Sequence, residues 1–403
     1  MRDGRIATID GLRGIAILLV VWFHVWQITW QSAVIPGINF SLQPLAETGF
    51  LGVALFFFIS GFVLMLPYAQ TRIAGTPAHT WGHFYWRRFI KIVPSYVLCI
   101  AAMIAFGYQT YPNLAAAVKD VGFHLLFIHS WFAATYGSLN GVLWSLAVEV
   151  QFYAIFPLIA LLFVRRPLLT AAALFAIANG WRVWCMLSPH TYYEMKLAQL
   201  PGYVDFFAAG MLGAWICASV ATHRPHLAER RLWFSLLMVA GFVAFWFLAK
   251  NCYDHRYDPE WPQLWVVEWR SAVALVFLAT ALGAVFAARR LQLALANPVL
   301  LFLAVISYNL YLFHTAIAHG LLVAGIPPHA TADPHGDRTW QVAYWLVAIP
   351  AMLIVASAIT YGFERPLLRL RAPRWPRPPG RDRRFGLRYW SHENRGPEGT
   401  RAR

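Results

Sequence analysis

An arginine and a histidine, Arg13 and His24, lie in the first apolar segment of the chain, residues 6–30. Their separation amounts to about three helical turns plus roughly 20°, so in a helix both side chains share one face, with His24 roughly 16 Å further along the axis. If Arg13 marks the edge of a bilayer, His24 is near the middle of a hydrocarbon core roughly 30 Å thick. An imidazole is costly to bury there, so we expect a functional role. The structural alternative is a histidine that donates to a carbonyl of a neighbouring helix.

A carboxylate occurs in another apolar segment, which reads VLWSLAVEVQFY over residues 142–153. Ser145 and Glu149 are four residues apart and share a helix face, and Trp144 precedes them. Glu149 is expected about 10 Å inside the outer boundary of the membrane. A carboxylate at that depth needs a partner, a proton or a water-filled cavity, which makes Glu149 a second candidate.

A polar stripe follows one face of a later apolar helix, in the sequence SYNLYLFH at residues 307–314. Ser307, Tyr311 and His314 recur there at i, i+4 and i+7. His314 is also expected in the outer half of the membrane.

Two further positions indicate a functional site less specifically. Ser60 and Gly61, in FFFISGF, favour a bend or the close approach of a neighbouring helix, and close packing is the simpler interpretation. Asp205, near the outer end of another apolar segment, is a candidate for the acceptor side, although an interface position would let water solvate it.

A basic cluster lies in the sequence HFYWRRFIKIVPSY, residues 83–96. Arg87, Arg88 and Lys91 crowd one end of a helix at spacings of three and four residues, and Arg13 belongs to the same side of the membrane. Such a group suits a polyanion, and phosphates are common ligands of arginine. The alternative is topological, since positive charges hold a loop on the cytoplasmic side.

The spacing of these groups along the membrane normal suggests one site. His24, Glu149 and His314 can meet in the outer half, above the four basic residues at the inner face. A histidine–carboxylate pair suits general base catalysis, with Glu149 orienting the His24 ring. We therefore expect a phosphate-bearing donor threaded across the membrane, with no metal involved.

Composition bounds the fold class. Of 403 residues, 59% are hydrophobic, 16% aromatic and only 13% charged, which is typical of a membrane protein. The four cysteines show no paired spacing, so neither a disulfide framework nor a zinc site is expected. From Arg365 onward there are twelve arginines and three acidic residues. Attraction to anionic lipid headgroups explains this basic stretch more simply than nucleic acid, which we do not expect as a partner.

The apolar segments predict an all-α polytopic membrane protein with about ten transmembrane helices. A shorter apolar run, residues 121–132, is too short to cross and is predicted to be re-entrant or interfacial. Placing both termini in the cytoplasm puts most lysines and arginines on the inner side, as the positive-inside rule requires. We predict a transmembrane domain over residues 1–365 and a disordered Pro/Arg-rich cytoplasmic tail over residues 366–403. The ten predicted spans are 15–35, 48–66, 90–108, 142–163, 168–187, 201–220, 232–250, 268–287, 299–325 and 340–362.

The order of the motifs resembles acyltransferase family 3, the bacterial integral-membrane proteins that O-acylate surface polysaccharides and other exported glycans. The resemblance covers about residues 6–370, and an arginine, ten residues and a histidine form that family's signature, matched here by Arg13 and His24. The matching stretches read IDGLRGIAILLVVWFH, FFFISGF, RRFIKIVPSY, LWSLAVEVQFY, SYNLYLFH and FERP.

The resemblance implies acyl-CoA, usually acetyl-CoA, as a cytoplasmic donor substrate, with no permanently bound cofactor. It also implies a carbohydrate acceptor on the outer side of a bacterial inner membrane. His24 matches the essential histidine, and Glu149 matches the acidic residue of the family's WS-x-x-x-E motif. Two departures stand out: Lys91 replaces an arginine, which loses the planar fork, and Tyr203 stands where a basic residue is expected.

We therefore predict a membrane O-acyltransferase in which His24 takes the acceptor's proton or briefly carries the acyl group. The alternatives are a proton-coupled transporter or flippase of a lipid-linked sugar, in which His24 and Glu149 relay protons, and an inactive acyltransferase-like receptor or scaffold. The predicted catalytic residues are His24 and Glu149. The predicted donor-binding residues are Arg13, Arg87, Arg88 and Lys91. The predicted supporting or acceptor-side residues are Asp10, Ser60, Trp144, Ser145, Asp205, Tyr311 and His314.

Overall fold

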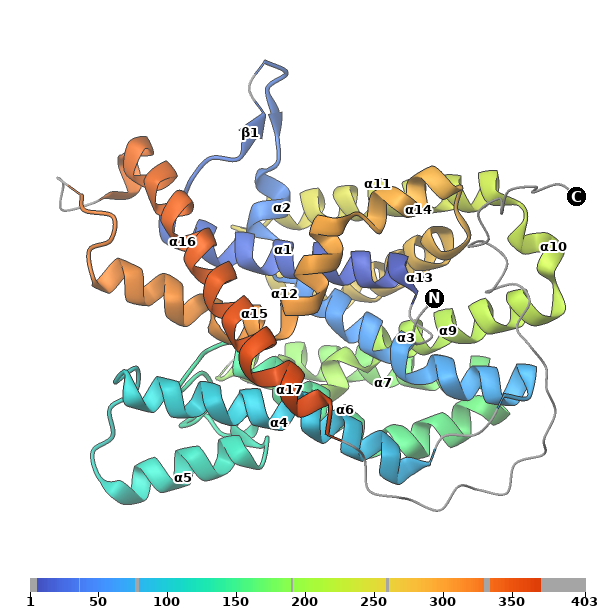
Figure 1. Ribbon diagram of the computed structural model, residues 1–403, viewed down its shortest axis with the longest axis horizontal. Coiled ribbons are helices and arrows are strands. Elements are labelled where there is room, and N and C mark those ends of the chain that lie inside the picture. The colour runs from blue at the N-terminus through green and yellow to red at the C-terminus, as the bar shows by residue number, and fades with distance from the viewer. Residues whose placement is uncertain are drawn as a thin grey trace, which may run out of the picture.

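The computed structural model describes residues 6–35, 37–76, 80–189, 191–258, 261–329 and 334–370. Within these ranges the chain is a bundle of long helices that run roughly along one direction, with a small β-hairpin that projects from one side of the bundle (Figure 1). We call the end of the bundle at which α1 leads into the hairpin the hairpin end, and the opposite one, where α1 begins, the N-terminal end.

Nine helical stretches in the described ranges are long and apolar enough to cross a bilayer, and a bent pair can supply a tenth span. This confirms the prediction of an all-α protein with about ten crossings. The bent pair is α13 (Arg270–Phe286) and α14 (Arg289–Leu295), which meet at 119°. The nine helices are α1 (Ala7–Thr29), α3 (Leu51–Ala74), α4 (Trp81–Ala105), α6 (Leu143–Arg165), α7 (Pro167–Leu187), α9 (Val204–His223), α11 (Arg231–Asp254), α15 (Pro298–Val323) and α16 (Arg338–Ile359).

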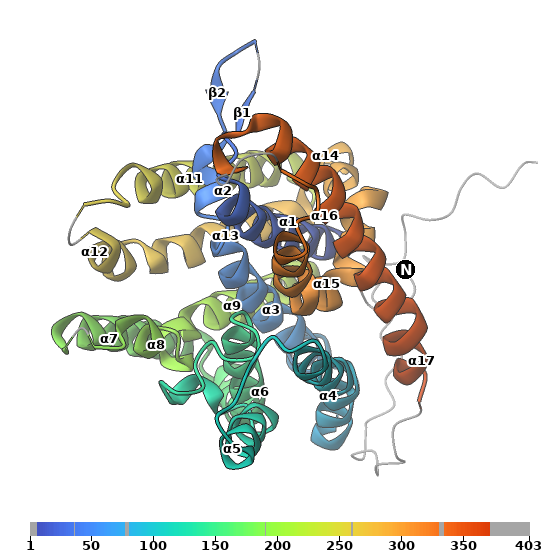
Figure 2. The same cartoon turned by 90° about the vertical axis from the view of Figure 1, so that its left-hand side faces the viewer.

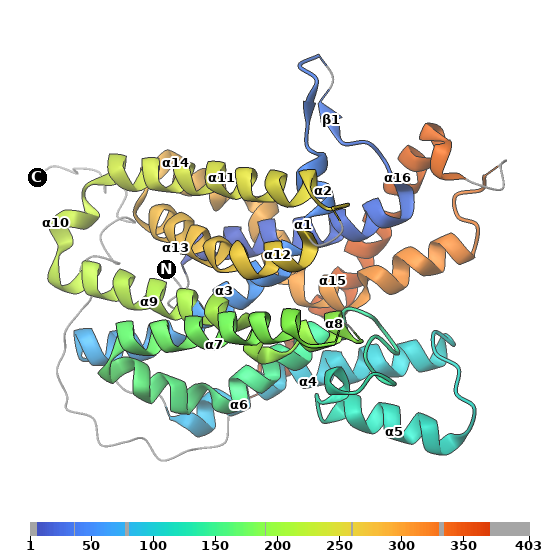
Figure 3. The same cartoon turned by 180° about the vertical axis from the view of Figure 1, so that it is seen from behind.

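Short elements connect these helices. The hairpin pairs β1 (Val34–Ile35) with β2 (Phe40–Ser41) in antiparallel register. The apolar run at residues 121–132 forms the end of α5 (Leu114–Leu125) and the turn after it, which is too short to cross; Figures 1 and 3 show α5 beside α4. The remaining short elements are α2 (Gln43–Glu47), η1 (His129–Trp131), α8 (Tyr193–Leu197), η2 (Leu200–Tyr203), α10 (Pro225–Ala228), α12 (Trp261–Glu268), η3 (Pro334–Gly336), the π-helix η4 (Thr360–Glu364) and α17 (Arg365–Leu368).

Two helices begin earlier than predicted, which changes where their charged residues lie. Helix α4 starts at Trp81 instead of residue 90, because the Thr80 hydroxyl caps it by accepting from the His83 backbone N–H at 3.3 Å. Arg88 therefore lies inside the helix, two turns from its start. Helix α1 likewise starts at Ala7 instead of residue 15. The predicted tail lies outside the described residues from 371 onward.

Helices α3 and α9 cross in close contact, which confirms the packing interpretation of Ser60-Gly61. A Cβ built on Gly61 would lie 2.2 Å from the Phe207 carbonyl oxygen, and one on Gly210 would lie 1.9 Å from that of Phe58. Only glycine permits this approach. The contact fixes Ser60 in the middle of the bundle, where the end-on view in Figure 2 shows α3 between α9 and α1.

We expect the substitution Gly61→Leu to prevent assembly of the folded bundle, because the new side chain would overlap the α9 backbone. The measurement is the yield of monodisperse protein in detergent and its thermal midpoint. The control is Gly180→Leu on α7, where a Cβ meets nothing within 4 Å. Equal behaviour of the two variants would contradict the close crossing.

Candidate active site

A cavity with a mixed polar and apolar lining lies among α1, α3, α4, α6 and α15, and its empty space, open solvent included, is about 860 Å³. Its α3 wall extends from Val53 to Val63, which corresponds to about 15 Å along the helix. The cavity brings together eight predicted or related polar residues from five separate helices. They are Arg13, Ser60, Arg88, Lys91, Ser145, Glu149, Ser307 and Tyr311.

Two of the arginines in this cavity have no anionic partner. Among the described residues, neither Arg13 nor Arg88 forms an ion pair or a hydrogen bond. The Arg88 guanidinium faces the Tyr153 ring, with its central carbon 5.6 Å from the ring centroid. Arg87, by contrast, is exposed and does not line the cavity. Three of the four predicted cations therefore converge, and Arg87 does not.

Lys91 lines the same cavity but has a partner that sequence reasoning missed. Its ammonium forms an ion pair with Glu364, which lies in the FERP motif at the end of the π-helix η4. The Lys91 ammonium also faces the Tyr308 ring at 5.2 Å. A single sequence cannot reveal this pair, because its two residues are 273 positions apart.

Glu149 lies in the cavity instead of against His24. One of its oxygens, Oε1, accepts hydrogen bonds from the hydroxyls of Ser60 and Tyr153. The predicted contact between Glu149 and His24 is therefore wrong. Since the i, i+4 face of α6 points toward the arginines, the carboxylate shares a cavity with them and balances part of their charge.

His24 pairs with the other predicted histidine. His314 Nε2 lies 3.1 Å from His24 Nδ1, and the two rings meet edge to face at 4.8 Å. His314 is fully buried, while His24 is partly exposed. The pair joins α1 to α15, two helices that pack along each other.

The surrounding carbonyls determine where the protons of this pair lie. His314 Nδ1 lies 2.8 Å from the Tyr311 carbonyl oxygen and 3.1 Å from that of Leu310, so this nitrogen carries a hydrogen. In the neutral ring His314 Nε2 is then an acceptor, and it receives the Nδ1 hydrogen of His24, which also points at the Val20 carbonyl at 2.9 Å. A neutral His24 therefore keeps its lone pair on Nε2, where a base or nucleophile needs it.

Neither His24 nor His314 lines the cavity, but His314 lies beside one residue of its wall. Tyr311, which lines the cavity, has its ring 5.8 Å from that of His314. Its hydroxyl lies 2.5 Å from Ser145 Oγ and donates to the Val142 carbonyl. Tyr311 thus links the wall of the arginine-bearing cavity to His314, and Ser145 contacts its hydroxyl.

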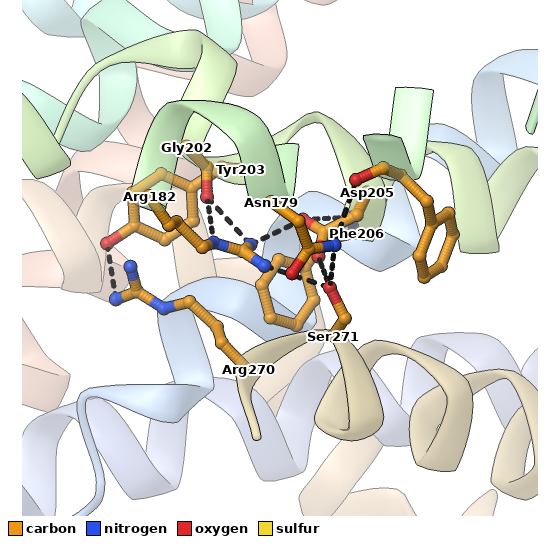
Figure 4. A network of polar contacts seen from close by, with 9 residues as sticks. Asn179, Arg182, Gly202, Tyr203, Asp205, Phe206, Arg270 and Ser271 are labelled. Atoms are coloured by element: carbon orange, nitrogen blue, oxygen red, sulfur yellow. Dashed lines mark hydrogen bonds and ion pairs between the residues drawn. The ribbon is translucent and has the colours of Figure 1, made fainter. Parts of the chain in front are cut away.

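Asp205 lies outside the cavity, in a buried network of polar contacts. It is fully buried, and its carboxylate binds the Arg182 guanidinium at 2.7 Å and the Ser271 hydroxyl at 2.8 Å (Figure 4). Arg182 also donates to the Gly202 carbonyl. This network joins α7, α9 and α13, and water does not solvate it.

The remaining predicted residues lie outside the cavity. Trp144 packs against the rings of Phe57 and Tyr203. Asp10 is partly exposed near the start of α1, one turn before Arg13. Tyr203, which stands where a basic residue is expected, contacts one from another helix: the Arg270 guanidinium lies 4.5 Å from its ring centroid and donates to its hydroxyl.

Replacing Arg182 with Met should destabilise the protein by about 3–5 kcal/mol, because it leaves the Asp205 carboxylate buried without its cation. The measurement is the thermal midpoint of the purified protein. The matched control is Lys250→Met, which removes a pair with Asp254 that is about half exposed and should cost less than about 1 kcal/mol. Comparable midpoints for the two variants would show that the buried pair is not a structural support.

Comparisons with known proteins identify a family and several relatives. A family described as an acyltransferase domain matches residues 6–361. A putative membrane-bound transacylase, BcsY of Komagataeibacter xylinus, is 26% identical over 79% of this chain and 77% of its own length. No solved structure gives a significant match.

Two further relatives match a shorter stretch. The peptidoglycan O-acetyltransferase OatA of Listeria monocytogenes is 27% identical over 40% of this chain, and the O-acetyltransferase OatA of Staphylococcus aureus is 27% identical over 39%. The matched region spans about a quarter of the length of each. The family match, by contrast, covers all the helices that line the cavity, so the chain belongs to acyltransferase family 3.

Proposed function

We propose that the protein is a membrane O-acyltransferase that moves an acetyl or other short acyl group from acyl-CoA to a hydroxyl of an exported carbohydrate. One observation carries this proposal: a cavity with two unpaired arginines adjoins a histidine pair that leaves His24 Nε2 free. The family and the names of the relatives support acyl transfer and a carbohydrate acceptor.

The arginines would hold the donor. Acyl-CoA carries phosphates, and guanidinium groups bind phosphate through paired hydrogen bonds. Arg13 and Arg88 have their donors uncommitted, and Lys91 adds a third positive charge. The long arm of CoA would then follow the cavity toward Tyr311 and carry the thioester to the histidines. The exposed Arg87 would take no part.

His24 Nε2 would act on the acceptor in one of two ways. As a general base it takes the proton of the acceptor hydroxyl while that oxygen bonds to the thioester carbonyl carbon, the carbon–sulfur bond breaks and the CoA thiolate leaves. As a nucleophile, Nε2 first bonds to that carbon while the carbon–sulfur bond breaks and the CoA thiolate leaves; the acceptor oxygen then bonds to the carbon, the carbon–nitrogen bond breaks, and the imidazole takes the hydroxyl proton. Both routes need the lone pair on Nε2, which His314 secures through the opposite nitrogen.

Glu149 would serve the donor cavity. Its carboxylate fixes the hydroxyls of Ser60 and Tyr153 and balances Arg13 and Arg88, which share the cavity with it. In this proposal His314, and not Glu149 as predicted from the sequence, orients the His24 ring.

The setting of the reaction follows from the proposed orientation. With both termini in the cytoplasm, the cations of the cavity lie toward the inner face, where acyl-CoA is found, and the hairpin end faces the acceptor. The bacterial inner membrane is the bilayer we infer, and the basic tail from residue 366 would bind its anionic headgroups.

Replacing His24 with Ala should abolish acyl transfer while the protein still inserts and folds. The measurement is transfer of label from acetyl-CoA to a glycan acceptor by the purified protein in lipid nanodiscs, with the exposed His226→Ala as control. Transfer by the His24 variant at the wild-type rate would remove His24 from the chemistry. A wild type that moves sugar across the bilayer but leaves the thioester intact would favour the transporter.

Replacing Arg88 with Gln should raise the KM for acyl-CoA about tenfold or more, because one charge-assisted phosphate contact is lost. Its neighbour provides the matched control, since Arg87→Gln removes the same charge from an exposed position and should leave KM nearly unchanged. Equal effects of the two substitutions would mean that surface charge, and not the cavity, attracts the donor.

A further inference from the structure

The carboxylate of Glu364 is placed in the bundle by an unusual piece of helix. The last turn of α16 widens into the π-helix η4, which ends at Glu364, and α17 continues from Arg365. Single π turns inside α-helices often occur at functional sites. Glu364 is 3% exposed, although it is acidic and lies next to the end of a transmembrane helix.

Both oxygens of this buried carboxylate have partners. Oε1 binds the Lys91 ammonium, and Oε2 accepts from the Asn309 amide at 2.9 Å. The same amide donates to the Thr360 hydroxyl at 2.9 Å. The three helices α4, α15 and α16 therefore meet at Glu364, which holds Lys91 in one position.

Lys91, the partner of Glu364, faces the donor cavity. The Lys91 side chain is 31% exposed and lines the cavity, whereas Glu364 lies behind it. The cavity thus has two unpaired arginines, Arg13 and Arg88, and one ammonium already neutralised by a carboxylate that is not part of the wall. A phosphate that reaches Lys91 must share it with Glu364.

We propose that Glu364 is a positioning residue that competes with the donor phosphates for Lys91 and so weakens the hold on CoA. This inference rests on the proposed function of the cavity. Acyl-CoA and the product CoA carry the same phosphates, so a site that binds them too tightly releases product slowly. Glu364 holds Lys91 in position for phosphate binding, and the ion pair between the two forms again when CoA leaves.

The test is the binding of CoA itself to the full-length protein in lipid nanodiscs, without turnover. Glu364→Gln removes the competing charge and keeps the size of the side chain, so the Kd for CoA should fall about five- to tenfold. In turnover, kcat should fall together with KM, because product release slows. Binding by this variant should also weaken more steeply with salt than binding by the wild type.

Three control variants separate the charge from the structure around it. Glu364→Asp keeps the charge and should bind CoA as the wild type does. Thr360→Val removes the hydroxyl that shares the Asn309 amide and should have no effect on CoA. In a Lys91→Met background, Glu364→Gln should no longer change the Kd, because the group for which the carboxylate competes is gone.

Several results would overturn the inference: an unchanged or weaker hold on CoA in Glu364→Gln, the same tightening in Glu364→Asp, or tightening that persists without Lys91. These results differ from a failure of the proposed function. If CoA binding does not depend on Arg88, the cavity is not a donor site. If it does depend on Arg88 and Glu364→Gln still does not bind more tightly, only the role of Glu364 is excluded.

Discussion

The hydrogen bond between two histidines is the interaction on which the proposed chemistry of this protein depends. His314 has its Nδ1 fixed by the carbonyls of Leu310 and Tyr311, and it therefore accepts at Nε2 from His24. A carboxylate in that place would stabilise the protonated form of His24, whereas a neutral imidazole fixes the tautomer without supplying a charge. The nitrogen that we propose to react, His24 Nε2, is thus selected by backbone geometry in α15.

Charged groups in the middle of the bundle fall into two cases. Arg182 and Asp205, which join α7 to α9, bind each other and find further partners within the fold. Arg13 and Arg88, which line the cavity, keep their capacity for hydrogen bonds and ion pairs unused. Because an unpaired cation within a membrane is costly, the unused capacity is best explained by a ligand that supplies the missing negative charge. Lys91 combines the two cases, since it has a protein partner and also faces the cavity.

Much of the fold followed from composition and periodicity, because a bilayer requires long apolar helices. The spacing of Arg13 and His24 along α1 and the polar face of α15 were also predictable, since helical geometry fixes spacing within one helix. Contacts between different helices could not be predicted in this way. Glu149 was expected at His24 because both are polar and at a similar depth, but depth does not determine which way a helix turns its side chains. The pairing of Lys91 with Glu364 joins residues 273 positions apart.

The most direct measurement is an experimental structure with a non-hydrolysable acetyl-CoA analogue bound. The account predicts phosphate density at Arg13 and Arg88, the arm of CoA along the cavity, and the acyl end beside Tyr311 within reach of His24 Nε2. Phosphates bound outside this cavity, or a His24 ring turned so that Nε2 faces His314, would contradict it.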